Sequence, residues 1–204
     1  PIPYDDYHFS ENVIQKYGVV GLPGSATKKN GSSNNNEGFS IQQQILEQVK
    51  TAIATGREYD SQLFINDYWE LAIEEAAYGV HLGQEDLDTA DLSRIRAAGL
   101  RLGISTHGYA EMLRAHQYAP SYIALGAIFP TTLKQMQTAP QGLGRLTYYA
   151  QLLAQYPLVG IGGVDENNIT QVLDTGVGSA ALVRAVINAL DYTAAINTLQ
   201  KHFK

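Results

Sequence analysis

From residue 39 onward the chain repeats one pattern, in which an amphipathic helical stretch precedes a short apolar run that ends in polar residues or glycine. Such runs recur roughly every twenty residues, a spacing typical of parallel strands joined by helices. The predicted strands are 63–66, 79–82, 101–105, 122–125, 158–162 and 179–183. The predicted helices are 41–57, 91–98, 109–116, 143–155 and 166–174. This alternation predicts an α/β protein with a parallel sheet.

Six such units, with room for two more upstream, favour a closed (β/α)8 TIM barrel over an open doubly wound sheet. With 204 residues and 45% hydrophobic content, the chain is long enough for one barrel and short for two ordinary domains. We therefore predict a single barrel domain over residues 1–204, with an irregular N-terminal region. Residues 23–38, which are rich in Gly, Ser and Asn, are predicted to form a mobile loop. In such barrels the active site lies at the carboxyl ends of the strands.

The composition narrows the kinds of partner. A formal net charge of −6 and a pI near 5.3, without a stripe of Lys and Arg, argue against a nucleic-acid surface. No apolar run reaches the length of a membrane span, so we expect a cytoplasmic protein that binds small molecules and no membrane. The absence of cysteine excludes disulfides, thiolate nucleophiles and cysteine-ligated zinc. A homo-oligomer is compatible with these features.

Acidic side chains follow two consecutive predicted strands. Asn66 and Asp67 come at the end of the first, and Asp86 follows the second. Mg²⁺ is typically bound by one or two carboxylates and completes its shell with water and phosphate oxygens. Asp67 and Asp86 are therefore predicted to bind a divalent cation beside a phosphorylated ligand. The alternative is that both are solvated caps of the helices that follow.

A hydroxyl and an imidazole, those of Ser105 and His107, follow the third predicted strand. The hydroxyl at this position can bind a phosphate oxygen. The alternative is an ordinary N-cap for the helix that begins near Tyr109. His81 lies between apolar neighbours inside a strand, and we interpret it as a hydrogen-bonded interior histidine rather than a ligand.

Further groups suited to an anionic substrate lie beyond the later strands. Thr131 and Lys134 supply a hydroxyl and an ammonium group in the connection after the fourth strand. The glycine-rich segment 160–163 predicts close approach of backbone to a ligand. The helix starting near Arg184 offers N–H groups to a phosphate, as the last loops of many barrels do.

Taken in order, the segments FINDYW, GVHLGQEDL, GISTHG, YIALGAIFPTTLKQM, APQG and GIGGV closely resemble the thiamine-phosphate synthase family, over residues 39–204. The resemblance implies a (β/α)8 barrel transferase of thiamine biosynthesis, with Mg²⁺ as its metal. Such an enzyme joins 4-amino-2-methyl-5-hydroxymethylpyrimidine diphosphate to 4-methyl-5-(2-hydroxyethyl)thiazole phosphate, giving thiamine phosphate and pyrophosphate. Its partners are therefore small phosphorylated molecules.

Carried over position by position, the resemblance implies that Asp67 and Asp86 hold Mg²⁺ against the diphosphate, while Asn66 contacts the pyrimidine. Ser105 and Lys134 are the implied catalytic residues, and Lys134 stabilises the departing pyrophosphate. The implied substrate-binding residues are Asn66, Ser105, Thr131, Lys134, Gly163, Val183 and Arg184. Among them, the backbone around the last two takes the thiazole phosphate.

The N-terminal region departs from the family pattern. The Gln-Leu-Arg-x-Lys motif that usually grips the pyrimidine diphosphate at the second strand is absent, and Lys28 and Lys29 are the only nearby cations. A diverged and inactive enzyme, a shifted or rearranged segment over 20–38, and a lid of altered chemistry all account for this. We hypothesise that the chain binds the thiazole phosphate better than the pyrimidine diphosphate.

Two alternatives to the synthase remain. One is a thiazole tautomerase-like relative, in which His107 transfers a proton as general acid and base. The presence of both Asp67 and Asp86 argues against it, since tautomerisation needs no diphosphate site. The other is a non-catalytic ligand-binding member of the same barrel family, which the missing N-terminal motif favours.

Overall fold

The computed structural model describes residues 41–131 and 138–203. The strands follow one another in chain order in a six-stranded sheet, and the pairs β1–β2, β4–β5 and β5–β6 are parallel. The described residues fall into two compact units, divided within β3 between Gly103 and Ile104. Within the described ranges, no helix has the length and apolar character needed to cross a membrane.

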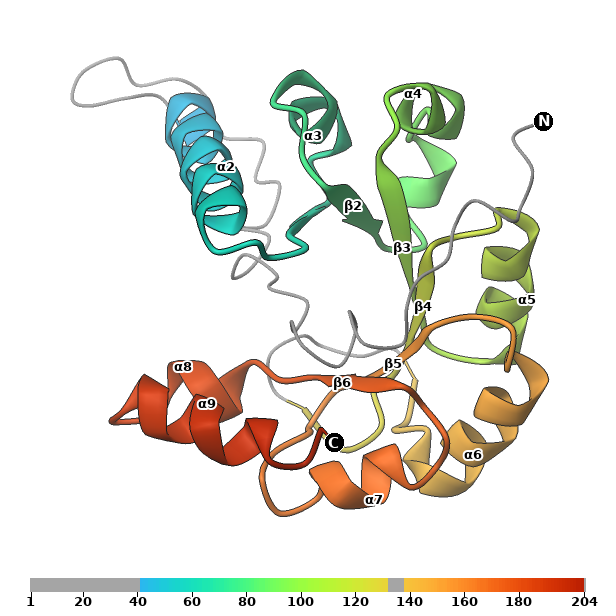
Figure 1. The fold of residues 1–204 in the computed structure, drawn as a ribbon. Helices are drawn as coiled ribbons and strands as arrows, with labels where there is room; N and C mark the ends of the chain where they lie inside the picture. The colour runs from blue at the N-terminus through green and yellow to red at the C-terminus, as the bar shows by residue number, and fades with distance from the viewer. Residues whose placement is uncertain (1–40, 132–137, 204) are drawn as a thin grey trace. The chain divides into compact units, whose positions relative to one another are not determined.

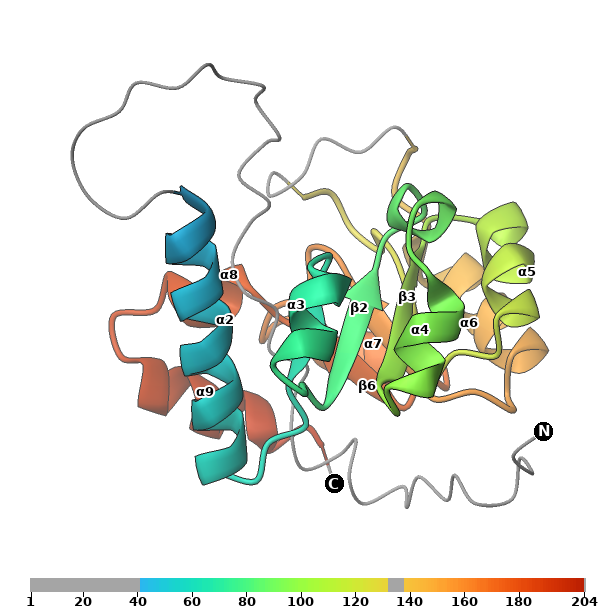
Figure 2. The ribbon, with the colours of Figure 1, turned by 90° about the horizontal axis from the view of Figure 1, so that it is seen from above.

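The 41–103 unit begins with a long amphipathic helix. Its elements are α2 (Ile41–Glu58), β1 (Phe64–Asn66), α3 (Trp69–Glu74), β2 (Gly79–Leu82), the 3-10 helix η2 (Asp86–Asp88), α4 (Leu92–Ala97) and the first half of β3 (Arg101–Thr106). Helix α2 buries Val49 and Ile53, which lie four residues apart on one face. Helices α3 and α4 lie on the same side of β2 and β3 (Figures 1 and 2).

Aromatic side chains pack at the amino ends of β1, β2 and β3. Phe64 of β1 lies opposite Gly79 of β2, and its ring meets the ring of Tyr78 edge-on, with 5.5 Å between centroids. The guanidinium carbon of Arg101 lies 4.0 Å from the centroid of the Tyr78 ring. A Cβ atom at Gly79 would lie 2.5 Å from the Phe64 ring. Glycine at this position therefore lets the ring lie across the strand.

The 104–203 unit continues the alternation of strand and helix. Its elements are the second half of β3, α5 (Tyr109–Gln117), β4 (Tyr122–Leu125), α6 (Gly142–Leu152), β5 (Leu158–Ile161), α7 (Ile169–Leu173), β6 (Ser179–Ala181), α8 (Arg184–Ile187) and α9 (Tyr192–Gln200). Every residue of β4 is buried, which is typical of a parallel strand covered on both faces.

Close packing against β5 depends on Gly160. A Cβ atom there would lie 2.8 Å from Cγ1 of Val172 in α7 and 2.9 Å from Cδ1 of Ile128, in the segment after β4. Both neighbours are fully buried, at 0% and 1% exposure. A methyl group would therefore have to displace side chains that have no space to move into.

All six predicted strands are confirmed, although three are shorter than predicted and β3 is one residue longer. β5 stops at Ile161 because Gly162 has a φ of 96°, which no extended strand residue adopts. The five predicted helices are confirmed to within three residues at each end, whereas α3 and α9 were not predicted. The irregular N-terminal region, with room for two further units and the predicted loop 23–38, lies outside the described residues. The eight-stranded closure and the single domain stay predictions.

The glycine at position 160 provides a stability test. Gly160→Ala should destabilise the protein by about 1–3 kcal/mol, because the added methyl group overpacks the core. Gly144→Ala is the matched control, since Gly144 lies within α6 and no heavy atom lies within 4 Å of the added Cβ. It should stabilise by about 0.5–1 kcal/mol through helix propensity. Urea unfolding measures both, and changes of equal sign would contradict this account of the packing.

Candidate active site

Asn66 and Asp67 lie at the carboxyl end of β1. Asn66 pairs with His81 of β2, and the N–H of Asp67 donates to the His81 carbonyl oxygen at 2.9 Å. The pairing of β1 with β2 thus continues one residue past the strand. Asp67 has a φ of 65°, a left-handed conformation that Asp and Asn tolerate better than other non-glycine residues. The turn at Asp67 leads the chain directly into α3.

The second acidic residue, Asp86, begins the short helix η2 after β2. Its Oδ2 accepts a hydrogen bond from the N–H of Gly83 at 3.3 Å, and its side chain is partly buried, as is that of Asp67. Neither aspartate occupies an N-cap position, because Tyr68 caps α3 and Glu85 caps η2. The helix-cap alternative therefore does not describe these two residues.

His81 interacts with both aspartates. Its backbone carbonyl accepts from Asp67, and its ring interacts electrostatically with Asp86. Burial lowers the pKa of His81 to about 4, and the negative charge of Asp86 opposes this only in part. The imidazole is therefore neutral near pH 7, and its side chain is partly buried.

The side chains after β1 and β2 include two that can donate oxygen ligands to a metal ion, those of Asp67 and Asp86. Over residues 41–131 and 138–203, no three His, Asp or Glu side chains form a group that could hold a metal. Asp67 and Asp86 supply two carboxylates, which is the number Mg²⁺ usually takes from a protein. The remaining positions would then belong to water and to phosphate oxygens.

In the 104–203 unit, Ser105 and Thr106 end β3 and project to opposite faces of the sheet. Thr106 is 2% exposed, and its hydroxyl donates to the carbonyl oxygen of Ala124 at 3.0 Å. Ser105 is only partly buried. One hydroxyl thus ties β3 to β4, while the other lies on the opposite face.

The backbone after β3 is tied to the first turn of α5. Oε2 of Glu111 accepts from the N–H of His107 at 2.7 Å and lies 2.8 Å from Nδ1 of the same residue. The N-cap of α5 is Gly108, so the predicted alternative role of Ser105 as the cap does not hold. Glu111 therefore ties the residue before the N-cap to the first turn of α5.

Two glycines with positive φ, Gly162 and Gly163, follow β5. A Cβ at Gly162 would lie 2.6 Å from Cα of Ala127, and one at Gly163 would lie 2.8 Å from the carbonyl oxygen of Pro130. The close approach of a ligand that the sequence predicts at these glycines stays a prediction. The structure shows close approach of the chain itself, because the segment after β4 packs against them.

The remaining predicted residues lie on three connections. Thr131 directly follows Pro130 and is partly buried, so the contact of that segment with Gly163 brings these two positions together. Lys134 lies outside the described residues. Val183 and Arg184, at the start of α8, are both exposed.

Sequence reasoning missed two amide side chains that hold the strand ends. Nδ2 of Asn168 donates to the carbonyl oxygen of Gly163 at 3.0 Å, and its Oδ1 accepts from the N–H of Asp165 at 3.0 Å. Nε2 of Gln141 donates to the carbonyl oxygen of His107 at 2.7 Å. Asn168 precedes an apolar run, as an N-cap does, and Gln141 lies in the APQG segment. Neither sequence pattern predicts which distant backbone group the amide contacts.

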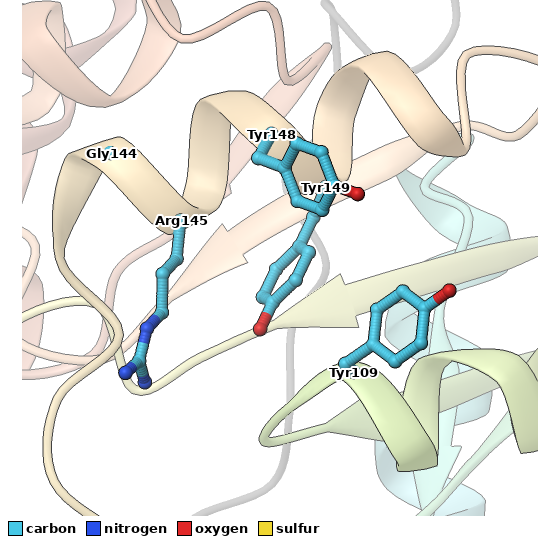
Figure 3. Close-up of a pocket in the computed structure, with 5 residues that line it drawn as sticks. All are labelled: Tyr109, Gly144, Arg145, Tyr148 and Tyr149. Atoms are coloured by element: carbon cyan, nitrogen blue, oxygen red, sulfur yellow. The ribbon is translucent and has the colours of Figure 1, made fainter.

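A hollow of about 490 Å³ lies beside α5 and α6 (Figure 3). It is lined by Tyr109, Gly144, Arg145, Tyr148 and Tyr149. None of the predicted site residues lines it, so the predicted chemistry does not depend on this hollow.

Comparison with known proteins gives consistent matches. The model of the thiamine monophosphate synthase family matches residues 39–186. The thiamine-phosphate synthase of Serratia proteamaculans is 56% identical over 153 residues, which cover 75% of this chain and 72% of that protein. That of an Enterobacter species is 58% identical over 147 residues, covering 72% and 70%. The solved thiamine phosphate pyrophosphorylase of Pyrococcus furiosus superimposes with a TM-score of 0.71 at 31% identity, covering 81% of this chain and 78% of that one.

The hydrogen bonds of Asn168 predict a local stability effect. Asn168→Asp keeps the acceptor for Asp165 but places an oxygen against the carbonyl of Gly163, which should destabilise the protein by about 1–3 kcal/mol. Asn167→Asp is the matched control, because it adds the same charge one residue away on an exposed side chain. Its effect should stay within about 0.5 kcal/mol. Thermal or urea unfolding measures the stability of both variants. Equal losses of stability would show that the contact of Asn168 with Gly163 does not stabilise the protein.

Proposed function

We propose that this chain, which belongs to the thiamine monophosphate synthase family, joins 4-amino-2-methyl-5-hydroxymethylpyrimidine diphosphate to 4-methyl-5-(2-hydroxyethyl)thiazole phosphate. The products are thiamine phosphate and pyrophosphate. The observation that carries this proposal is the family match over residues 39–186, with 56% identity to a named synthase.

In this reaction the bond from the pyrimidine methylene carbon to the diphosphate oxygen breaks, and pyrophosphate leaves with the electron pair. The electron-rich aminopyrimidine spreads the positive charge left on the methylene carbon. The thiazole nitrogen then donates its electron pair and forms the new carbon–nitrogen bond. The protein must therefore orient two substrates and stabilise charge on the leaving group, and it needs no nucleophile of its own.

We assign the pyrimidine to the end of β1 and the diphosphate to the ends of β3 and β4. The amide of Asn66 would hydrogen-bond the pyrimidine. The hydroxyl of Ser105, on the face opposite the buried Thr106, would donate to a diphosphate oxygen. Thr131 and Lys134 would add a hydroxyl and a cation for the departing pyrophosphate.

The thiazole phosphate is assigned to the last strand end. Val183 and Arg184 lie at the start of α8. The first N–H groups of a helix have no hydrogen-bond acceptor within the helix and can donate to a phosphate. The exposed guanidinium of Arg184 would add a positive charge. Gly163 would lie beside both substrates.

Asp67 and Asp86 would hold Mg²⁺ against the diphosphate, as their two partly buried carboxylates suit. When bound, the ion neutralises negative charge that develops on the leaving pyrophosphate. The neutral ring of His81 adds no positive charge to compete with the cation.

Family membership also supports the finer structural predictions. We propose that the sheet closes into a (β/α)8 barrel within one domain, as the sequence pattern indicates. The substrates proposed here are small phosphorylated molecules of the cytoplasm, where we expect the protein to act.

One observation favours a second activity. The imidazole of His107 lies 2.8 Å from a carboxylate oxygen of Glu111, and such a pair can transfer protons. A thiazole tautomerase-like reaction would use it. The two aspartates after β1 and β2 would then have no role, which is why the synthase is preferred.

The test is an assay with both substrates and Mg²⁺ that quantifies thiamine phosphate and pyrophosphate. Asp86→Asn should lower turnover by about a hundredfold, because charge on the leaving group loses its stabilisation. Glu85→Gln is the matched control, since it removes one charge from an exposed neighbouring side chain. It should retain turnover within about twofold. Chelation of the metal should abolish product, and added Mg²⁺ should restore it.

Other outcomes of the same assay contradict the proposal. Tautomerised thiazole without pyrophosphate would point to the second activity. Thermal stabilisation by the substrates without turnover would indicate a non-catalytic binding protein. Equal rates for Asp86→Asn and Glu85→Gln would remove the carboxylate from the mechanism.

A further inference from the structure

We infer that Gln141 is a positioning residue, whose side-chain amide fixes the backbone that follows Ser105 relative to the backbone that follows β4. This inference rests on the proposed function, in which Ser105 contacts the diphosphate. Gln141 itself is not proposed to contact a substrate. It acts through the carbonyl group of His107, two residues after Ser105.

The orientation of the Gln141 amide is set by its four neighbours. Nε2 donates to the carbonyl oxygen of His107 at 2.7 Å and lies 3.3 Å from that of Ala139. Oε1 lies 3.5 Å from both the hydroxyl of Tyr149 and Nη1 of Arg145. Carbonyl groups only accept hydrogen bonds, whereas guanidinium groups only donate them. The reversed amide would place oxygen against two carbonyl oxygens, so only one orientation is favourable.

The two donors approach the amide oxygen from α6. Figure 3 shows the side chains of Arg145 and Tyr149 leaving this helix with their polar ends directed toward the same side. Gln141 directly precedes α6, and Arg145 and Tyr149 follow it by four and eight residues. At this spacing the three side chains lie on the same face of the helix. The start of α6 therefore holds the amide from one end.

The backbone beside Gln141 is fixed to the end of the sheet. Its N–H donates to the carbonyl oxygen of Ala127 at 2.8 Å, and the N–H of Gly142 donates to that of Ile128 at 2.9 Å. The N–H of Ile128 in turn donates to the carbonyl oxygen of Ile161 at 2.9 Å. Gln141 is thus anchored to the backbone after β4 and β5, and its side chain extends this network to the backbone after β3.

The segment after β3 is held from two sides. The carbonyl group of His107 accepts from Gln141, and its N–H donates to Glu111 at 2.7 Å. Loss of the first contact would leave a partly buried carbonyl group without this donor and free the backbone to shift. Because a displacement of a catalytic group by about 1 Å lowers rates by up to about a hundredfold, a small shift of Ser105 would be measurable.

The experiment compares Gln141→Glu with Gln151→Glu. The first has nearly the same size and keeps an oxygen toward Tyr149 and Arg145, but it replaces the donor to His107 with an acceptor. The second makes the same chemical change on an exposed residue of α6. Turnover, both KM values, the thermal midpoint and hydrogen–deuterium exchange of the peptide spanning 105–108 are measured for each.

For Gln141→Glu we expect kcat to fall by about tenfold or more and the KM for the diphosphate to rise. The KM for the thiazole phosphate should not change, and the peptide 105–108 should exchange faster than in wild type. Gln151→Glu should match wild type in every measurement. These results would separate positioning of Ser105 from a general loss of stability.

The inference is overturned if Gln141→Glu and Gln151→Glu share the same kcat and the same exchange. It is also overturned if the loss of kcat accompanies a lowered thermal midpoint and a rise in both KM values. Absence of product from the wild-type protein would instead refute the proposed function. The exchange measurement would still test the Gln141 contact in that case.

Discussion

Beyond the ends of β4 and β5, backbone packs directly against backbone, and the arrangement of this strand end depends on that contact. The N–H groups of Ile128 and Phe129 donate to the carbonyl oxygens of Ile161 and Gly162 at 2.9 and 3.0 Å. A Cβ atom at Gly126 would overlap the carbonyl oxygen of Ile161. Glycine is therefore required where the two chains approach, and the approach extends the sheet pairing past both strands. The connection toward Thr131 leaves from this fixed backbone.

Two amide side chains join the other connections to this backbone. Asn168 donates to the carbonyl of Gly163, and Gln141 donates to that of His107. An amide carries both donor and acceptor, so one side chain can satisfy groups on two segments at once. Such contacts do not titrate between pH 5 and 8 and are not screened by salt as exposed charge pairs are. These two amide contacts should therefore persist while the charges of substrates and metal change.

Strand β4 could be predicted from the sequence because the 122–125 run is buried throughout, as parallel strands covered on both faces are, and the other strands because short apolar stretches recur at a regular spacing. Helix α3 was missed because its six residues show little helical period and no capping side chain marks its start, whereas the equally short α4 begins at the capping residue Asp91. The ends of strands mark Asp67 and Gly163 as candidates, but not the packing of Gly163 against residues 129–130. That contact joins segments more than thirty residues apart, and no local pattern encodes it. The same limit applies to the partner of Gln141.

The backbone at Asp67 decides which substitution isolates the role of its carboxylate. A φ of 65° disfavours most L-residues by roughly 1–2 kcal/mol, while Asn and Asp tolerate it because their short polar side chains bond locally. Replacement by Ala would remove the charge and strain the turn after β1 together, whereas Asn removes the charge alone. At Asp86, which lies in the helix η2, the backbone makes no such demand. If the Ala and Asn variants differ more in activity or stability at position 67 than at position 86, the difference would therefore reflect strain in the turn and not stronger binding of the metal.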